Sequence, residues 1–418
     1  MRGRGLILAA PSSGAGKTTV TLGLLRALSL RGPVRGAKSG PDYIDPAFHE
    51  AACGRPSMNL DAWAMGETRI RSLAAGTELL LIEGAMGLFD GAPPDGRGAT
   101  ADLARMLGLP VVLVVDAARM SHSVAALVAG FAGHDPQVRV AGVILNRTGS
   151  PRHAAMLRRA LEPSGLPVLG ALPRDQGLDL PSRHLGLVQA MEHPALETFL
   201  DTAADRVRAH LDLDALEALA APFDADPGPT RRHGGTVAVA QDAAFAFLYP
   251  HTRRHWELAG IEVRSFSPLA DEPVPEADRI LLPGGYPELH AERLAQARTF
   301  MQSLRNAAQH TDIMGECGGY MVLGESLTDA AGREHPMAGL LALKTSFAER
   351  RLHLGYRRLK RRDRPGLFTG HEFHYATTLK AVGAPLYDAW DAEGTALPPM
   401  GLVEGRVAGS FAHVIDVA

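Results

Sequence analysis

The stretch LILAAPSSGAGKTT, Leu6 to Thr19, decides how the first half of the chain folds. An apolar run over residues 6–10 leads into a loop of small residues ending Gly16-Lys17-Thr18, and apolar residues then recur at helical spacing. This order predicts a strand, a phosphate-binding loop and a helix, because glycines let backbone N–H groups point into one concavity and a lysine reaches the outer phosphates. A threonine in this place offers a hydroxyl to Mg²⁺.

The match to the phosphate-binding loop has one departure. The strict G-x-x-x-x-G-K-[ST] spacing requires a glycine where this chain has Pro11. A glycine and serine turn before an ordinary helix is the alternative, but strand, loop, GKT and helix come in the order that the motif demands. We therefore expect ATP to bind this loop, with contacts from Gly14, Gly16, Lys17, Thr18 and Thr19.

Length and composition indicate a globular protein of about two domains. The chain has 418 residues and a formal net charge of −3, so it offers no global basic field for nucleic acid or for an anionic membrane. Cys53 and Cys317 are its two cysteines, which we expect to be thiols in a reducing cytoplasm. No apolar run approaches the roughly 18 residues that cross a bilayer, and the short run after Arg4 does not resemble a targeting signal.

Short apolar runs alternate with helical patterns in the first half. This alternation predicts βαβ units around a buried parallel sheet, with strands near residues 78–82, 110–115, 138–145 and 166–172. Ligands of open parallel sheets lie beyond the carboxyl ends of the strands, so the residues that close each run are the candidates for function.

Acidic residues stand at two of these strand ends. Asp45 lies in the loop after the segment 33–38, and Glu83 closes the run 79–82. Together with Thr18 they are expected to form one Mg²⁺ site, because this ion prefers hard oxygen ligands. The alternative for each carboxylate is a helix cap or a turn residue.

Asn146 and Pro173 close two further strands, and we expect both beside the nucleotide. The amide of Asn146 offers a donor and an acceptor that suit the edge of adenine, whereas a turn role is equally compatible with its spacing.

A composition rich in proline, glycine and charge separates the halves. It predicts a first domain over residues 1–222, a linker over 223–235 and a second domain over 236–418. New strands are expected near residues 236–240, 261–266 and 279–282.

Cys317 is the chemical centre of the second half. It lies in Gly315-Glu316-Cys317-Gly318-Gly319, where an apolar run enters a tight turn before an expected helix. This predicts a nucleophile on a strained elbow whose helix lowers the thiol pKa; a buried core cysteine is the alternative.

A nucleophilic cysteine needs a base, and His371, His374 and His413 are the candidates. Zinc at His371 and His374 is conceivable, but the sequence shows no further ligands and no H-E-x-x-H spacing. We favour His413, in the segment Ser410-Phe411-Ala412-His413.

The chain resembles the cobyrinic acid a,c-diamide synthases of cobalamin biosynthesis over essentially its whole length. The resemblance rests on the order of the segments APSSGAGKTT, GPDYIDPAFH, IEGAMGLFDG, ILNR, PSRHLGL, FSPLAD, PGGYPEL, GECGGYM, LGYR, GHEFHY and SFAHV. It implies an α/β protein with two parts. The first is similar to dethiobiotin synthetase, with a P-loop and a parallel sheet, and the second is similar to class I glutamine amidotransferases.

The resemblance also implies roles for matching residues. Lys17 and Thr18 contact phosphate and Mg²⁺, Asp45 and Glu83 complete the metal site, and Asn146 faces adenine. Asp42 and Asp90 lie where the corrinoid carboxylates bind. Cys317 and His413 form the glutaminase pair, with the backbones of Gly285 and Gly318 near the oxyanion.

The implied reaction consumes glutamine, ATP and a corrinoid polycarboxylate. ATP phosphorylates a carboxylate and ammonia displaces the phosphate, once each at the c and a side chains; the metal-free hydrogenobyrinic acid is favoured over the cobalt form. A homodimer is possible.

One departure concerns the base. Many class I amidotransferases carry a glutamate two residues after the histidine, where this chain has Ile415, and Asp416 remains unassigned.

Three rival functions remain open from the sequence. The first is a cobyric acid synthase, which amidates other corrinoid carboxylates, although GPDYIDP and GHEFHY favour the diamide enzyme. The second is a ParA-like or partner-binding P-loop ATPase with a non-catalytic amidotransferase-like domain, and the third is a nucleotide-binding regulatory protein.

Overall fold

The computed structural model describes residues 2–178, 182–183, 186–225 and 232–417. The chain forms two compact units, Met1–Gly228 and Pro229–Ala418. Both are mixed α/β structures, as predicted. Part of the expected linker, residues 226–231, and part of the PSRHLGL segment lie outside the described residues.

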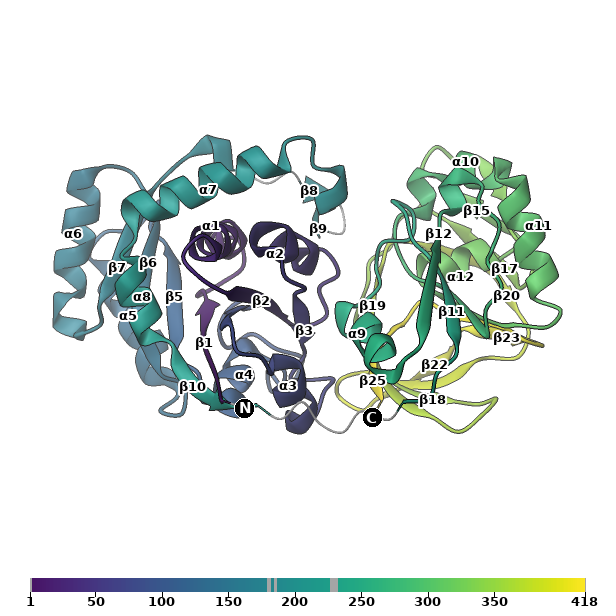
Figure 1. The fold of residues 1–418 in the computed structure, drawn as a ribbon, viewed down its shortest axis with the longest axis horizontal. Helices are drawn as coiled ribbons and strands as arrows, with labels where there is room; N and C mark the ends of the chain where they lie inside the picture. The colour runs from purple at the N-terminus through teal and green to yellow at the C-terminus, as the bar shows by residue number, and fades with distance from the viewer. Residues whose placement is uncertain (1, 179–181, 184–185, 226–231, 418) are drawn as a thin grey trace. The chain divides into compact units, whose positions relative to one another are not determined.

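A mostly parallel sheet forms the centre of the N-terminal unit (Figure 1). Its strands follow the order β3-β2-β4-β1-β5-β6-β7. Leu6, Ile7 and Leu8 in the middle of the sheet have no exposed surface, which explains why the second half of β1 is apolar at consecutive rather than alternate positions. The bounds are β1 (Arg2–Ala9), β2 (Val34–Ser39), β3 (Met58–Leu60), β4 (Leu79–Glu83), β5 (Val111–Asp116), β6 (Val140–Thr148) and β7 (Val168–Pro173).

Helices cover both faces of this sheet. In Figure 1, α1 (Lys17–Ser29), α2 (Asp45–Cys53) and α7 (Leu196–His210) lie on one side, and α3 (Glu67–Ala74) and α4 (Thr100–Leu107) on the other. The remaining helices of the unit are α5 (Ser123–His134), α6 (Pro151–Leu161) and α8 (Leu213–Leu219).

The predicted start of the linker is too early. Residues 221–224 form strand β10 (Ala221–Asp224), which pairs antiparallel with β1. Phe223 is 4% exposed and packs directly over Gly3, where an added Cβ would lie 2.5 Å from its ring. Residues 223 and 224 therefore belong to the N-terminal sheet. Composition alone missed this strand because Pro222 and Asp224 are typical of loops.

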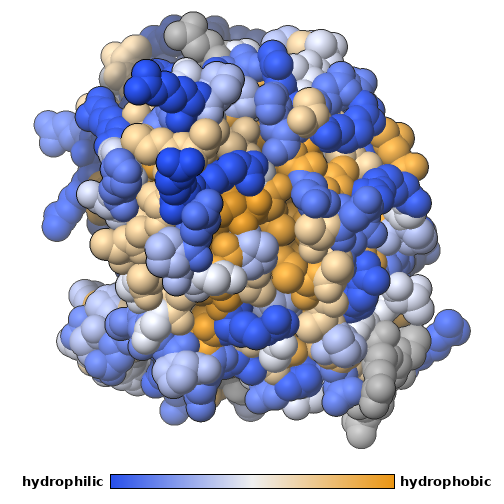
Figure 2. All heavy atoms as spheres, turned by 90° about the vertical axis from the view of Figure 1, so that its left-hand side faces the viewer, coloured by the Kyte–Doolittle hydropathy of each residue, from blue (hydrophilic) through white to orange (hydrophobic). Residues whose placement is uncertain are grey.

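Helix α5 is apolar but little buried. Its sequence is SVAALVAGFAGH, of which only Val124 and Val128 are buried. Figure 2 views the molecule from the side of α5 and α6 and shows apolar side chains gathered on this face, bordered by polar ones. The N-terminal unit thus presents an apolar surface that its own core does not cover.

The C-terminal unit is built on a six-stranded sheet of order β12-β11-β13-β14-β24-β23. Four-stranded and five-stranded sheets accompany it, in the orders β16-β15-β17-β20 and β22-β21-β18-β19-β25. The helices are α9 (Pro250–Ala259), α10 (Ala291–Gln296), α11 (Arg298–Ala307) and α12 (Gly318–Leu323).

The first three expected strands of this unit are present as β11 (Thr236–Ala240), β12 (Glu262–Phe266) and β13 (Arg279–Leu282). The strand before the elbow is β14 (Asp312–Glu316). The others are β15 (Ser326–Thr328), β16 (Glu334–Pro336), β17 (Ala342–Ser346), β18 (His353–Arg361), β19 (Leu367–His374), β20 (Thr377–Val382), β21 (Tyr387–Trp390), β22 (Ala396–Met400), β23 (Leu402–Glu404), β24 (Val407–Ser410) and β25 (His413–Val417).

Among the helices that the structure describes, none combines the length and the apolar character needed to traverse a bilayer.

Candidate functional site

The predicted phosphate-binding loop connects β1 to α1. Gly14 and Gly16 adopt φ angles of 79° and 83°, a region that favours glycine, and a Cβ on Gly16 would collide with the amide of Asn146. Pro11 does not occupy a left-handed position, which proline cannot adopt. The departure from the strict motif therefore falls where the loop needs no glycine.

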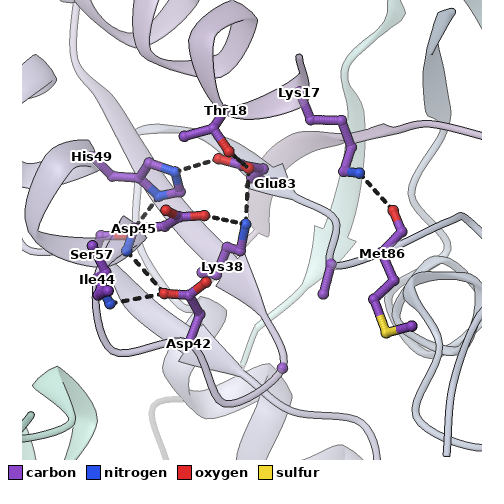
Figure 3. Close-up of polar contacts among 12 residues, drawn as sticks. Lys17, Thr18, Lys38, Asp42, Ile44, Asp45, His49, Ser57, Glu83 and Met86 are labelled. Carbon is purple, nitrogen blue, oxygen red and sulfur yellow. Dashed lines mark hydrogen bonds and ion pairs between the residues drawn. The ribbon is translucent and has the colours of Figure 1, made fainter. Parts of the chain in front are cut away.

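Lys17 opens helix α1 and points toward the loop after β4 (Figure 3). Its Nζ donates a hydrogen bond of 2.5 Å to the carbonyl of Met86. Burial and the neighbouring charge of Lys38 lower the pKa of Lys17 to about 8. The side chain is thus held at the edge of the sheet where a phosphate is expected.

The three expected metal ligands lie together at the ends of β2 and β4 (Figure 3). Thr18 Oγ1 donates to Glu83 Oε1 at 2.6 Å. Lys38 Nζ donates to the same oxygen at 2.8 Å and also to Asp45 Oδ2. Two carboxylates and a hydroxyl therefore surround one cationic position, and this set of hard oxygen donors fits Mg²⁺.

Sequence reasoning missed Lys38 as a member of this cluster. It is 5% exposed and stands opposite Glu83 in the parallel pairing of β2 with β4. The signal was present, because Lys38 stands near the carboxyl end of β2, directly before the Ser39-Gly40-Pro41 turn.

His49 and Ser57 hold Glu83 from the other side. His49 Nε2 lies 2.7 Å from Glu83 Oε2, and His49 Nδ1 lies 3.1 Å from Ser57 Oγ. Glu83, His49 and Ser57 have no exposed surface. These contacts fix the orientation of the carboxylate, as groups behind a metal ligand commonly do.

The charges of the cluster depend on one another. Burial disfavours an ionised Glu83, but Lys38 and His49 outweigh that effect and hold the pKa of Glu83 well below its usual range. Burial also opposes the charge of Lys38, yet Asp45 and Glu83 raise the pKa of Lys38 above its ordinary value. Burial and the nearby Asp42 raise the pKa of Asp45 to about 7.

Asp42 and Asp90 adopt turn roles. Asp42 Oδ1 accepts from the backbone N–H groups of Ile44 and Asp45 at 2.8 and 3.0 Å. Asp90 Oδ2 accepts from the N–H of Gly87 at 2.8 Å. Both side chains therefore shape the loops beside the cluster of Lys38, Asp45 and Glu83, and a corrinoid contact from either stays a prediction.

A pocket beside the phosphate-binding loop brings together four of the expected nucleotide contacts, Gly16, Thr19, Asn146 and Pro173, whereas Gly14, Lys17 and Thr18 do not line it. It is lined by Gly16, Thr19, Val20, Asn146, Arg147, Leu172, Pro173, Asp175, Leu178, Ala203, Arg206 and Val207. The sequence reasoning missed the charged residues of this lining. Arg206 Nε pairs with Asp175 Oδ2 at 2.8 Å, and Arg147 bonds both Asp116 and the carbonyl of Gly14 at 2.7 Å.

Asn146 braces the loop in this structure. Its Nδ2 donates to the carbonyl of Ala15 at 2.9 Å, and its Oδ1 accepts from the N–H of Arg147 at 3.0 Å. The amide thus has a structural role at the pocket wall, and contact with adenine stays a prediction.

In the C-terminal unit Cys317 forms a strained elbow between β14 and α12. Its φ of 45° is a backbone conformation that non-glycine residues rarely adopt. The N–H of Cys317 donates to the carbonyl of Ser410 at 2.8 Å, which ties the elbow to β24. The predicted strand and turn are therefore present.

His413 and Cys317 meet beside Gly284. A Cβ added to Gly284 would lie 2.8 Å from His413 Nε2 and 3.3 Å from the Cβ of Cys317. A Cβ on Gly318 would lie 3.1 Å from the backbone nitrogen of Gly285. The structure thus gathers the expected cysteine, histidine and both glycines, and adds Gly284, whose missing side chain makes room for the imidazole.

The expected lowering of the thiol pKa is wrong for this structure. Cys317 is 2% exposed, and burial raises the pKa of its thiol, with a further contribution from the negative charge of Glu288. Burial, together with His371 and His374, lowers the pKa of His413 to about 3. These shifts favour the neutral form of both groups, so attack by the sulfur would require transfer of the thiol proton.

The region around His374 is richer in ligands than the sequence indicated. His353, Glu372 and His374 place one potential ligand atom each within 4.8 Å of one another, and His371 is not among them. Arg357 already binds Glu372 Oε2 through Nε at 2.9 Å and through the second guanidinium nitrogen at 2.7 Å. An added cation would have to compete with this guanidinium.

Comparisons with known proteins match both units. Residues 6–188 match a family model described as the CobQ/CobB/MinD/ParA nucleotide binding domain, and residues 236–416 match the CobB/CobQ-like glutamine amidotransferase domain. A curated relative from Brucella abortus, named hydrogenobyrinate a,c-diamide synthase, is 56% identical over 99% of this chain and 98% of its own length. Relatives with the same name from Rhizobium meliloti and Rhodobacter capsulatus are 56% and 53% identical over 99% of this chain, covering 99% and 98% of those proteins.

The buried cluster makes a stability prediction. Lys38→Met leaves Asp45 and Glu83 without their cation, so the free energy of unfolding is expected to fall by about 3–5 kcal/mol, as for other broken buried pairs. This free energy is measured by urea unfolding, and the transition to analyse is the one whose midpoint ATP shifts. Mg²⁺ is expected to stabilise this variant more than the wild type, because a divalent ion can supply the missing positive charge.

Arg26→Met is the matched control, since Arg26 also pairs with two carboxylates, Glu197 and Asp201, but at the surface. Its loss should stay below about 1 kcal/mol. Equal losses for the two variants, or no response of the Lys38 variant to Mg²⁺, would contradict the assignment of this cluster.

Proposed function

Because the chain belongs to the hydrogenobyrinate a,c-diamide synthase family, we propose that it converts the a and c carboxylates of hydrogenobyrinic acid to amides. It is a glutamine-dependent ligase that forms carbon–nitrogen bonds. The observation that supports the reaction best is the pairing of two sites in one chain. An oxygen-rich cluster stands beside a phosphate-binding loop, and a cysteine elbow stands beside a buried histidine.

The N-terminal unit activates the substrate. A carboxylate oxygen of the corrinoid attacks the γ-phosphorus of ATP, the bond to the β,γ-bridging oxygen breaks, and ADP leaves. Lys17 is placed to offset the negative charge of the transferred phosphoryl group. Thr18, Asp45 and Glu83 would hold Mg²⁺, which when bound neutralises phosphate charge. Ammonia then attacks the acyl carbon and displaces phosphate, which leaves the amide.

The C-terminal unit supplies the ammonia. Cys317 Sγ attacks the side-chain carbonyl carbon of glutamine while His413 takes the thiol proton and returns it to the leaving nitrogen. A thioester forms, and water hydrolyses it to glutamate. The backbone N–H groups of Gly285 and Gly318 are the proposed donors to the oxyanion, and their close approach supports that role.

We also propose that two copies of the chain associate through α5. The apolar and little-buried sequence of this helix supports a contact that excludes water.

Product masses test the choice of substrate. With ATP, Mg²⁺ and glutamine, metal-free hydrogenobyrinic acid is expected to gain two amides, at the a and c positions, and to react faster than the cobalt form. Mass spectrometry with fragment assignment reads both. Amides on other side chains would favour the cobyric acid synthase activity, and ATP turnover without any amide would favour a regulatory ATPase.

The two sites should fail separately. Cys317→Ala is expected to lower glutamine-dependent amidation at least about a thousandfold while amidation with added ammonium salt persists, because the carboxylate is still activated. Lys17→Ala should stop amidation with either nitrogen source and leave glutamine hydrolysis measurable. If Cys317→Ala lost both activities alike, the cysteine would not act as a glutaminase alone.

The proposed dimer has its own test. Ala126 is exposed on α5, so Ala126→Glu should leave the fold intact yet halve the mass that light scattering records. Leu30→Glu is the control, since Leu30 is an apolar residue with 68% exposure at the end of α1. A wild-type mass of one chain would overturn the proposal.

A further inference from the structure

Glu316 directly precedes the proposed nucleophile and lies against the proposed base. It ends strand β14, whose register places it opposite Ser410 of β24, three residues before His413. Its Oε2 lies 3.8 Å from His413 Nδ1. Its Oε1 accepts a hydrogen bond of 3.2 Å from the backbone N–H of Val414, so the carboxylate is tied to β25 next to the histidine.

Many class I amidotransferases carry a glutamate two residues after the histidine, but this chain has Ile415 there, which offers no carboxylate. Ile415 is apolar and 3% exposed, and its carbonyl lies 2.8 Å from Nε2 of the buried His251. Ile415 therefore belongs to the packed interior, and this position offers the histidine no carboxylate.

The two nitrogens of His413 face different neighbours. Nε2 lies near Gly284, on the side of Cys317, as the contacts of an added Gly284 Cβ indicate. Nδ1 is the nitrogen nearest Glu316. The order matches that of a cysteine, a histidine and an orienting carboxylate, with the acid at ion-pair distance from Nδ1, where a modest closing movement would let it hold the imidazole in the useful tautomer.

Glu372, another acidic group whose charge acts on Cys317, already has other partners. Glu372 binds Arg357 and also His374, whose Nε2 lies 2.9 Å from Glu372 Oε1. Among the described residues, the structure records no lysine or arginine in a salt bridge with Glu316. The recorded partner of Glu316 that can become positively charged is His413, through the imidazolium that it forms in the proposed reaction.

We propose that Glu316 is a positioning residue of the glutaminase, which orients His413 through Nδ1 and stabilises its imidazolium. This inference rests on the proposed roles of Cys317 and His413. The thiol proton passes to His413 Nε2 as the sulfur–carbon bond forms, and the carbonyl π electrons move to oxygen. Glu316 does not take up this proton, which goes from His413 to the leaving ammonia as the carbon–nitrogen bond breaks.

Burial gives this arrangement a physical purpose. Burial raises the pKa of Glu316 to about 7 and opposes the charge on His413, so each group resists ionisation alone. An imidazolium formed beside the carboxylate offsets part of both penalties. The carboxylate therefore favours the state that follows proton transfer over the resting state.

Glu316→Gln keeps the shape and removes the charge. We expect kcat for glutamine hydrolysis to fall at least about 100-fold with little change in KM, because the group does not contact glutamine. Amidation with ammonium salt should remain within about twofold of wild type, since activation of the carboxylate does not use Cys317. Glu316→Asp retains the charge at shorter reach and should recover part of kcat.

Asp329→Asn is the matched control. Asp329 also accepts from a histidine, with His335 Nε2 at 2.9 Å, and it belongs to the same unit but not to the cysteine elbow. This variant should keep glutaminase kcat within about threefold of wild type, as befits a largely structural pair.

Three results would overturn the inference. The first is a Glu316→Gln variant with unchanged kcat. The second is a variant in which KM for glutamine rises while kcat is unchanged. The third is a Glu316→Asp variant whose kcat is no higher than that of Glu316→Gln. Glutamine hydrolysis that survives Cys317→Ala would instead overturn the proposed glutaminase, and with it the role of Glu316, so the two failures are distinguishable.

Discussion

The N-terminal unit depends on a carboxylate buried at the end of a central strand. Glu83 has no exposed surface, and an isolated charge in such a place would be strongly destabilising. The parallel register of β2 and β4 places Lys38 opposite Glu83, and α2 brings His49 to its other oxygen. The charge of Glu83 is therefore compensated only when β2 and α2 are both correctly positioned. The phosphate-binding loop is linked to the same carboxylate by the hydrogen bond from Thr18.

Much of this arrangement follows from sequence, because apolar runs identify the strands and parallel strands end at one edge of a sheet. That reasoning brought Thr18, Asp45 and Glu83 together correctly. It missed Lys38 because the search for Mg²⁺ ligands looked for oxygen donors, and the compensating cation was not sought. It could not settle Asp42 or Asn146, because a short polar side chain after a strand can serve a ligand or the backbone, and only the contacts in space distinguish them.

At Cys317, burial is the property that the sequence predicted least well. The glycines around Cys317 indicated the elbow correctly, since a tight turn has a local signature. The sign of the thiol pKa shift depends on what packs around the sulfur from distant segments, including Gly284 and His413. Because α12 has only six residues and the site is closed, desolvation outweighs any favourable field from the helix. Strand β10 was not predicted for a related reason, because Phe223 packs against a residue more than 200 positions earlier in the chain.

Both sites therefore solve the same problem, which is how to keep ionisable groups in a dry environment until the reaction needs their charge. In the first, Lys38 binds Asp45 and Glu83 at the position where the oxygen donors fit Mg²⁺. It keeps Glu83 ionised and both carboxylates in place, whereas burial raises the pKa of Asp45 to about 7. In the second, no such cation is recorded beside Glu316 in the described chain, and in the proposed reaction the compensating charge would be the proton that Cys317 delivers to His413. A permanent cation beside Glu316 would repel the imidazolium of His413 and so oppose transfer of the thiol proton from Cys317. The absence of a glutamate two residues after His413 is then no deficiency, because the proposed carboxylate comes from Glu316, on the strand before Cys317, and lies nearest Nδ1 of the histidine.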